Sequence, residues 1–275
     1  MVKIGAHVSM AGGHSNALTK ALDMGCNSLQ FFSASPKGFF FAKLTDLQIE
    51  EFRKKKEELA IDPIYFHAAY LVNFANTERL GQLSVQLLVN ELKLASKMGV
   101  SGSIVHLGSY KTNGNGIEHL CENLQKTLDK IPDDVVFIIE NAGNRKIGLK
   151  IEEIGEIVKT INDPRIKVCL DTCHLHAAGY DLRTEETMNT FLDMFDEHVG
   201  LDRLELWHIN DSRDPFESLR DRHENLGDGQ VGTPVFENIV NNPRTKHHPF
   251  ILEVPGIEGL GPDKHNVDIL KSYIR

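Results

Sequence analysis

The sequence predicts a (β/α)8 TIM barrel, because short apolar runs alternate with helical segments and several of these runs end in an ionisable residue. A strand inside a parallel sheet is apolar because both of its faces are covered. A His, Glu or Asp at its end is costly unless it is paired or bound to a cation. In a barrel the carboxyl ends of the strands meet at one face, where the active site lies. The runs that end in this way are residues 64–67, 104–106, 135–140, 166–171, 204–208 and 250–253.

Each of the first four predicted strands precedes a segment with helical periodicity. The pairs are strand 3–7 with helix 15–24, strand 28–32 with helix 46–59, strand 64–67 with helix 79–98, and strand 102–106 with helix 117–130. The helix at 79–98 is the best marked, because its apolar residues recur on one broad face. That face carries Leu80, Leu83, Leu87, Leu88, Leu94, Ala95 and Met98.

The second half of the chain repeats this order. Strand 135–140 precedes helix 150–161, strand 166–171 precedes a helix with an apolar stripe from Met188 to Val199, strand 204–210 precedes helix 234–240 after a long irregular segment, and strand 249–253 precedes helix 263–273. Successive strand ends lie 25 to 45 residues apart, as from 7 to 32 and from 208 to 253, which suits a βα unit. No linker interrupts the series, so we expect a single TIM-barrel domain at 1–275.

Composition and charge restrict the class of protein. No apolar run is long enough to span a bilayer and no signal peptide is apparent, so we expect an intracellular protein, cytoplasmic or nuclear, without a membrane partner. Four cysteines are few for 275 residues and suit a reducing compartment. The net charge of −9 argues at first against a nucleic-acid partner. Three divalent cations would add six charges and bring it to about −3, so charge does not exclude one.

Nine side chains are candidate metal ligands: six end apolar runs, His174 follows one of these run ends, and Asp221 and His223 lie together on a loop. Asp171 and His174 are three residues apart at a strand end, where a turn can aim both into the mouth of the barrel. Asp221 and His223 are two residues apart and point the same way on an extended loop. Imidazole with carboxylate suits Zn, Mn or Fe better than Ca or Mg. The nine are His67, His106, Glu140, Asp171, His174, His208, Asp221, His223 and Glu253.

Nine ligands exceed the needs of one metal ion, and they fit three zinc sites if one carboxylate bridges two ions. His7 also ends a strand, and we expect it to contact a ligand or to face the substrate. Structural alternatives are that Asp171 only caps a helix and that residues 221–223 form a solvated charged loop. The other strand-end ligands weigh against both alternatives.

Two further motifs are set aside. Cys169 and Cys173 flank Asp171 and could bind zinc, but Cys169 lies within an apolar strand and is interpreted as a buried thiol. Residues 227–232 spell G-x-G-x-x-G, yet a charged loop precedes them and Thr233-Pro234 follows. A dinucleotide site needs a strand before this motif and a helix that begins within it. We therefore expect a flexible turn and no nucleotide cofactor.

The motifs that carry these residues resemble the endonuclease IV family of apurinic/apyrimidinic (AP) endonucleases from end to end. They are Ile4-Gly5-Ala6-His7-Val8-Ser9 with Gly12-Gly13, Asp171-Thr172-Cys173-His174, Ala177-Ala178-Gly179-Tyr180-Asp181, His208-Ile209-Asn210-Asp211-Ser212, Asp221-Arg222-His223 and Leu226-Gly227-Asp228-Gly229. Several motifs in the right order argue against a chance similarity.

The resemblance implies a TIM barrel with three zinc ions that acts on double-stranded DNA at abasic sites. It assigns the ions to His67, His106 and Glu140, to Glu140, Asp171, His208 and Glu253, and to His174, Asp221 and His223. Glu140 would bridge two ions, and Glu140 or Glu253 would orient the attacking hydroxide. Cleavage 5′ to the lesion, as a step of base excision repair, would leave a 3′-hydroxyl and a 5′-deoxyribose phosphate.

The resemblance also implies contacts with DNA. Tyr70 and Leu71 match a pair of side chains that enter the duplex at the lesion. Lys37 stands roughly where the family often has Arg, although lysine reproduces neither the planar stacking nor the donor fork of arginine. We expect a monomer.

Two other functions are open. A metal-dependent sugar isomerase or epimerase also uses a TIM barrel with acids and histidines at strand ends, but it needs one or two metal ions and leaves residues 221–223 unexplained. A non-catalytic protein that recognises damaged DNA could keep the barrel without activity, but the complete ligand set argues against it. Zinc stoichiometry separates the first alternative from a nuclease, and an incision assay separates the second.

Overall fold

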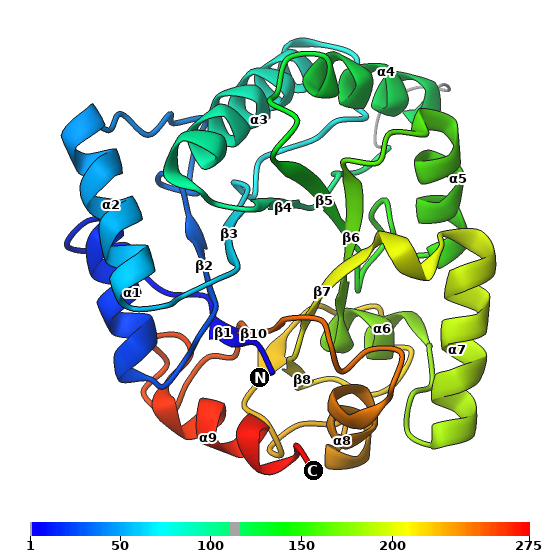
Figure 1. Ribbon diagram of the computed structural model, residues 1–275. Coiled ribbons are helices and arrows are strands. Elements are labelled where there is room, and N and C mark those ends of the chain that lie inside the picture. Colours follow the sequence, from blue (N-terminus) through cyan, green and yellow to red (C-terminus); the bar gives the residue numbers. More distant parts are fainter. Residues whose placement is uncertain (1, 111–115) are drawn as a thin grey trace.

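The computed structural model describes residues 2–110 and 116–275, and its centre is an eight-stranded parallel sheet curled into a barrel (Figure 1). The strand order is β1-β10-β7-β6-β5-β4-β3-β2. A parallel bridge between His7 and Gln30 joins β1 to β2 and closes the ring. The strands are β1 (Ile4–Ala6), β2 (Leu29–Phe32), β3 (Ile64–His67), β4 (Gly102–Val105), β5 (Val136–Glu140), β6 (Ile166–Asp171), β7 (Leu204–His208) and β10 (Phe250–Leu252). The predicted TIM barrel is confirmed.

The long helices form an outer ring around the strands (Figure 1). They are α1 (His14–Asp23), α2 (Asp46–Glu58), α3 (Arg79–Met98), α4 (Gly116–Leu128), α5 (Ile151–Ile161), α7 (Glu185–His198), α8 (Thr233–Asn241) and α9 (Lys264–Ser272). Local sequence fixes several of their ends. Thr45 begins α2 with a capping box, since its hydroxyl accepts a hydrogen bond from the Gln48 amide at 3.3 Å. Across the described residues, none of these helices combines the length and apolar character that crossing a membrane requires.

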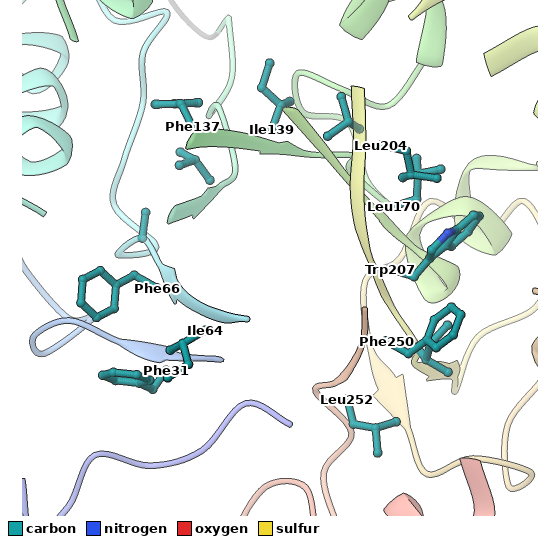
Figure 2. Close-up of a cluster of buried hydrophobic side chains, with 14 of the residues drawn as sticks. Phe31, Ile64, Phe66, Phe137, Ile139, Leu170, Leu204, Trp207, Phe250 and Leu252 are labelled. Carbon is teal, nitrogen blue, oxygen red and sulfur yellow. The ribbon is translucent and has the colours of Figure 1, made fainter. Parts of the chain in front are cut away.

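Side chains alternate between two layers along each barrel strand, because a strand has a period of two. One set packs between the strands and the helices, and it includes Phe66, Ile139, Leu170, Trp207 and Leu252, all without exposed surface (Figure 2). The other set fills the interior of the barrel and is named here the inner apolar layer. It consists of Tyr65, Ile104, Ile138, Cys169, Leu206 and Ile251. The barrel is therefore a packed core and not a pore.

Two elements near the carboxyl end of the barrel were not predicted. The short helix α6 (Thr172–Ala178) follows β6 directly, and Asp171 caps it by accepting a hydrogen bond from the His174 amide at 2.9 Å. The strands β8 (Asp211–Ser212) and β9 (His223–Glu224) form a two-stranded antiparallel ribbon. The predicted strand 204–210 was too long for this reason: β7 ends at His208, and the chain turns at Asn210 into the ribbon.

Candidate metal centre

Six of the nine predicted ligands stand two residues beyond a member of the inner apolar layer. Because the strand period is two, each ligand faces the same interior as its apolar partner. The pairs are Tyr65 with His67, Ile104 with His106, Ile138 with Glu140, Cys169 with Asp171, Leu206 with His208, and Ile251 with Glu253. These six ligands form a second layer at the carboxyl end of the barrel, which we name the ligand layer.

Glu140 lies at the centre of the ligand layer, and its two carboxylate oxygens face different partners. Its Oε2 lies 3.2 Å from His67 Nε2 and 3.1 Å from His106 Nε2, and these three residues are the first cluster. Its Oε1 lies 3.0 Å from His208 Nδ1. The second cluster consists of Glu140, Asp171, His208 and Glu253, whose ligand atoms lie within 4.8 Å of one another. One carboxylate therefore connects two groups of metal-ligating atoms.

The third cluster consists of His174, Asp221 and His223, which α6 and the β8–β9 ribbon bring to the mouth. His174 Nε2 lies 3.0 Å from Asp221 Oδ1, and His223 Nε2 lies 3.4 Å from the same oxygen. Asp171 Oδ2 lies 3.7 Å from His223 Nε2 and so connects this cluster to the second. Cys173 is also near Asp221 and His223, but burial raises the pKa of its thiol and keeps it protonated.

The charges of the site offset one another. Burial favours the neutral form of Glu140, but His106 and His208 outweigh it and hold the pKa of Glu140 well below its usual value. Burial also opposes protonation of His174, but Asp171 raises the pKa of His174 to about 10. Burial lowers the pKa of His106 to about 4 against the opposing charge of Glu140. The buried carboxylate of Glu140 therefore stays ionised and attracts positive charge to this end of the barrel.

Three histidines of the site have ring nitrogens arranged as metal ligands require. His67 Nδ1 lies 2.9 Å from Ala68 O, His174 Nδ1 lies 2.9 Å from Asn141 O, and His223 Nδ1 lies 3.3 Å from Glu253 O. A backbone carbonyl only accepts, so each Nδ1 carries the proton and each Nε2 is directed at a cluster. The Nε2 atoms of His174 and His223 are buried without a hydrogen-bond partner.

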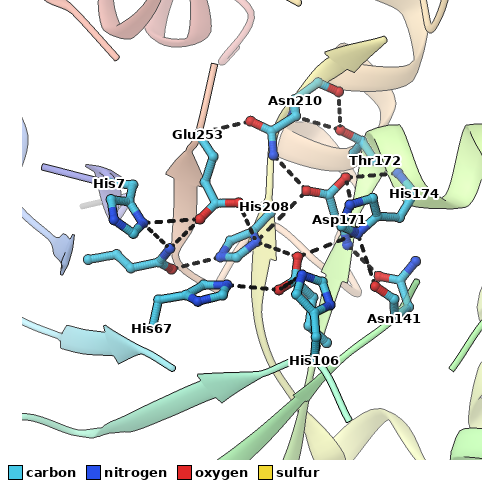
Figure 3. Close-up of polar contacts among 12 residues, drawn as sticks. His7, His67, His106, Asn141, Asp171, Thr172, His174, His208, Asn210 and Glu253 are labelled. Atoms are coloured by element: carbon cyan, nitrogen blue, oxygen red, sulfur yellow. Dashed lines mark hydrogen bonds and ion pairs between the residues drawn. The ribbon is translucent and has the colours of Figure 1, made fainter. Parts of the chain in front are cut away.

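No Lys or Arg among the described residues forms an ion pair with Glu140, Asp171, Asp221 or Glu253, whose ion-pair partners are histidines. Figure 3 shows two of these carboxylates, Asp171 and Glu253, beside His208. Four carboxylates within one small volume need compensating positive charge. Imidazole nitrogens that point at these carboxylates, with proton donors directed elsewhere, fit divalent cations of the transition series. The site therefore contains clusters of His, Asp and Glu side chains that suit metal ions.

A cavity of about 750 Å³ opens above the ligand layer. Tyr70 lines it with an exposed ring, 68% accessible, whose centroid lies 5.3 Å from that of Phe32. Leu71 and Lys37 are also exposed but lie outside the lining, on the loops that carry Tyr70 and Pro36. His7 lines the cavity, and its Nδ1 lies 3.2 Å from Glu253 Oε1.

Several polar residues of the site were missed from the sequence. Asn210 holds two ligands, because its Nδ2 donates to Asp171 Oδ2 at 2.6 Å and its Oδ1 accepts from the Glu253 amide at 2.8 Å. Gln30 is fully buried beside His208. Lys146 is the sole Lys or Arg among the described residues that line the cavity. Asn210 lies in a motif that the sequence marked, but no spacing pattern singled out Gln30 or Lys146.

The chain is similar to known proteins over nearly its whole length. The family model described as Xylose isomerase-like TIM barrel matches residues 18–273. The chain is 34% identical to a probable endonuclease 4 of Halothermothrix orenii, with 98% of this chain and 99% of the relative covered. The crystal structure of endonuclease IV from Thermus thermophilus superimposes on this chain with a TM-score of 0.88. The match covers 98% of each chain, with 33% sequence identity.

The likeness to sugar epimerases is one of fold alone. The crystal structure of a D-tagatose 3-epimerase-like protein matches with a TM-score of 0.72 but at 19% identity, over 98% of this chain and 96% of that one. Identity above 30% over nearly the whole length is found instead with the endonucleases. The chain therefore belongs to the endonuclease IV family of apurinic/apyrimidinic endonucleases, which makes it a nuclease and a hydrolase.

Proposed function

We propose that this chain is a zinc-dependent AP endonuclease that hydrolyses the phosphodiester 5′ to an abasic site in duplex DNA. The products would be a 3′-hydroxyl and a 5′-deoxyribose phosphate, as base excision repair requires. The observation that carries the proposal is the central position of Glu140, whose two oxygens face the first and the second cluster. Since duplex DNA is the substrate, the proposal also implies an intracellular protein.

Three zinc ions fit the donor set, one at each cluster. The first would be held by His67, His106 and Glu140, and the second by Glu140, Asp171, His208 and Glu253. The third would be held by His174, Asp221 and His223, since both histidines lie within 3.4 Å of the same Asp221 oxygen. When bound, zinc supplies positive charge that offsets the phosphate oxygens and makes hydroxide available at neutral pH.

The two glutamates have different surroundings, which supports different roles. Glu253 lines the cavity and keeps 15% of its side chain exposed, whereas Glu140 is fully buried beneath the mouth. Burial favours the neutral acid, but the charge of His208 holds the pKa of Glu253 well below its usual value. An ionised carboxylate at the cavity wall can accept a hydrogen bond from the attacking water and direct its lone pair at phosphorus. We assign this orienting role to Glu253 and the anchoring of the clusters to Glu140.

Side chains at the rim suit the recognition of a gap in the base stack. An abasic nucleotide has no base to unstack, so its rotation into the cavity is comparatively cheap. The exposed ring of Tyr70 and the neighbouring Leu71, 48% exposed, can occupy the vacated position. Lys146 at the cavity wall and Lys37 on the loop after β2 can contact the phosphates that flank the lesion.

The test is cleavage of a duplex oligonucleotide that contains a single abasic site, with the undamaged duplex as a control. The expected result is one cut 5′ to the lesion, a product that a polymerase extends from its 3′ end, and loss of cutting after chelation that added zinc restores. A protein loaded with zinc that leaves the abasic duplex intact would contradict the proposal. Epimerisation of a free ketose by that same preparation would favour the sugar-epimerase alternative.

A further inference from the structure

Gln30 is a buried amide on β2 that contacts three residues of the candidate site. Its Oε1 lies 2.7 Å from His208 Nε2, and its Nε2 lies 2.5 Å from Glu253 Oε1 and 2.8 Å from His7 Nδ1. The side chain has no exposed surface. Strand β2 contributes none of the nine predicted ligands, so Gln30 is its polar contribution to the interior of the barrel.

The contacts fix which way the amide of Gln30 points. An ionised carboxylate accepts hydrogen bonds and donates none, so the NH2 group of Gln30 must face Glu253. The carbonyl oxygen must then face His208, and it can only accept. The proton of the neutral His208 ring is therefore on Nε2, and the lone pair is on Nδ1.

The lone pair of His208 then points at the second cluster. Its Nδ1 lies 3.0 Å from Glu140 Oε1 and 3.3 Å from Glu253 Oε2. The three residues His7, His208 and Glu253 lie around one side of the site (Figure 3). Since Gln30 holds Glu253 by Oε1, the other oxygen of this carboxylate is left to face His208. One amide thus orders both an imidazole and a carboxylate of the same cluster.

We propose that Gln30 is the positioning residue of the second cluster, which sets the His208 tautomer and the orientation of Glu253 for metal binding. This inference rests on the proposed zinc-dependent function. Glutamine suits the position because it offers one acceptor and two donors at a fixed spacing. Partners of this kind hold the ring nitrogen that does not bind the metal, and their loss weakens metal binding by about 10- to 100-fold.

The test compares Gln30→Met with wild type. Methionine has a similar volume but removes the acceptor and both donors of Gln30. The matched control is Ser28→Ala, which removes a buried hydroxyl that donates to Pro63 O at 2.7 Å just before the same strand, away from the clusters. Zinc affinity is measured by competition with a chelator, and the His208 ring nitrogens are observed by NMR in the zinc-loaded protein.

For Gln30→Met we expect one of the three zinc ions to bind about 10- to 100-fold more weakly. The His208 Nε2–H signal should be lost or shifted, and kcat on abasic DNA should fall while KM changes little. Ser28→Ala should match wild type in zinc affinity and in the His208 signal. A Gln30→Met protein with unchanged zinc affinity and an unchanged His208 signal would overturn the inference.

A second variant decides the matter if Gln30→Met does not fold. Gln30→Glu keeps the size and the acceptor toward His208 but places a carboxylate against Glu253. We expect it to keep the His208 Nε2–H signal and to lose affinity for one zinc ion, and unchanged zinc affinity would overturn the inference. If wild type itself binds no zinc and does not cut abasic DNA, the proposed function fails and the inference with it. If wild type binds zinc and cuts abasic DNA, and both Gln30 variants match wild type in zinc affinity, the inference alone fails.

Discussion

The inner apolar layer and the ligand layer stand on the same six strands, two residues apart, and they are held by different forces. The apolar layer is fixed by shape and burial, so a substitution of similar volume costs little. The ligand layer is fixed by opposite charges that need one another or a cation, so a substitution that keeps the volume can still remove the site. On each of these strands, therefore, the residue that stabilises the fold and the candidate metal ligand are two positions apart.

The strongest test of this comparison changes one residue in each layer of β5. Glu140→Gln keeps the shape of the side chain but removes the charge that the first and second clusters share. We expect cleavage of abasic DNA to fall by more than about 100-fold, since even the loss of a residue that only supports a ligand costs about 10- to 100-fold. Single-turnover cleavage and zinc content measure this effect.

Ile138→Val is the matched change in the apolar layer. We expect it to lower the free energy of unfolding by about 0.5–1.5 kcal/mol and to leave cleavage near the wild-type rate. Full activity of Glu140→Gln, or loss of zinc in Ile138→Val, would contradict the assignment of stability to the inner apolar layer and of metal binding to the ligand layer.

Unlike the inner apolar layer, the third cluster should make the stability of the metal-free protein depend on pH. Burial opposes protonation of His174, but Asp171 raises its pKa to about 10, above the usual 6.5 of the unfolded chain. The folded protein therefore holds a proton that the unfolded chain has released between these values. This stabilisation is complete below about pH 6.5 and is lost as pH rises toward about 10.

We therefore expect the Tm of the chelated protein to fall by several degrees as pH rises through this window. The zinc-loaded protein should show a smaller fall, because a cation replaces the proton. Thermal unfolding of both forms across the same buffers measures the difference. Parallel curves for the two forms would contradict the assignment of His174 as a ligand.

Effects at the rim should be separable from effects in the ligand layer. Tyr70→Ala removes an exposed ring that contacts Phe32 and His67 but holds no ligand atom. We expect it to weaken binding of abasic duplex by about 1–3 kcal/mol, the usual range for stacking on a base, with zinc content unchanged. Leu47→Ala, at a site 78% exposed on α2, is the control and should leave binding unchanged. Loss of zinc without loss of DNA affinity would argue against the stacking role of Tyr70.

The smallest expected effect is that of Lys146→Ala. A lysine that contacts one phosphate contributes to DNA binding through counterion release. Its removal should therefore reduce the slope of log K against the logarithm of the salt concentration by about one. Lys54→Ala, on the outer face of α2, is the control. The slopes are measured by fluorescence titration at several salt concentrations. Equal slopes for wild type and Lys146→Ala would place the phosphate contact elsewhere.

The parts of the fold with strong periodicity were predicted well. The bounds of α3 (Arg79–Met98) and β3 (Ile64–His67) agree with the sequence prediction, because long apolar stripes and short apolar runs have clear ends. The helix α6 was missed because it has seven residues and begins at a polar cap instead of an apolar stripe. The β8–β9 ribbon was missed because two residues per strand give no alternation to detect.

The sequence identified candidate ligands where strand ends carry ionisable residues, and it did not single out other residues that the structure places at the candidate site. His67 and Glu140 follow apolar runs, so their cost of burial was visible in the sequence. Gln30 lies inside an apolar run, where a neutral polar residue is less conspicuous and its partners are distant in sequence. Lys146 is on a loop, and its position at the cavity depends on the path of the chain after β5.

The binding of three zinc ions is tested most directly by X-ray diffraction from crystals grown with zinc, measured on both sides of the zinc absorption edge. We expect three anomalous peaks, one at each cluster, with Glu140 between the first two. A map with the nine side chains turned apart, or with no zinc peak among them, would contradict this expectation.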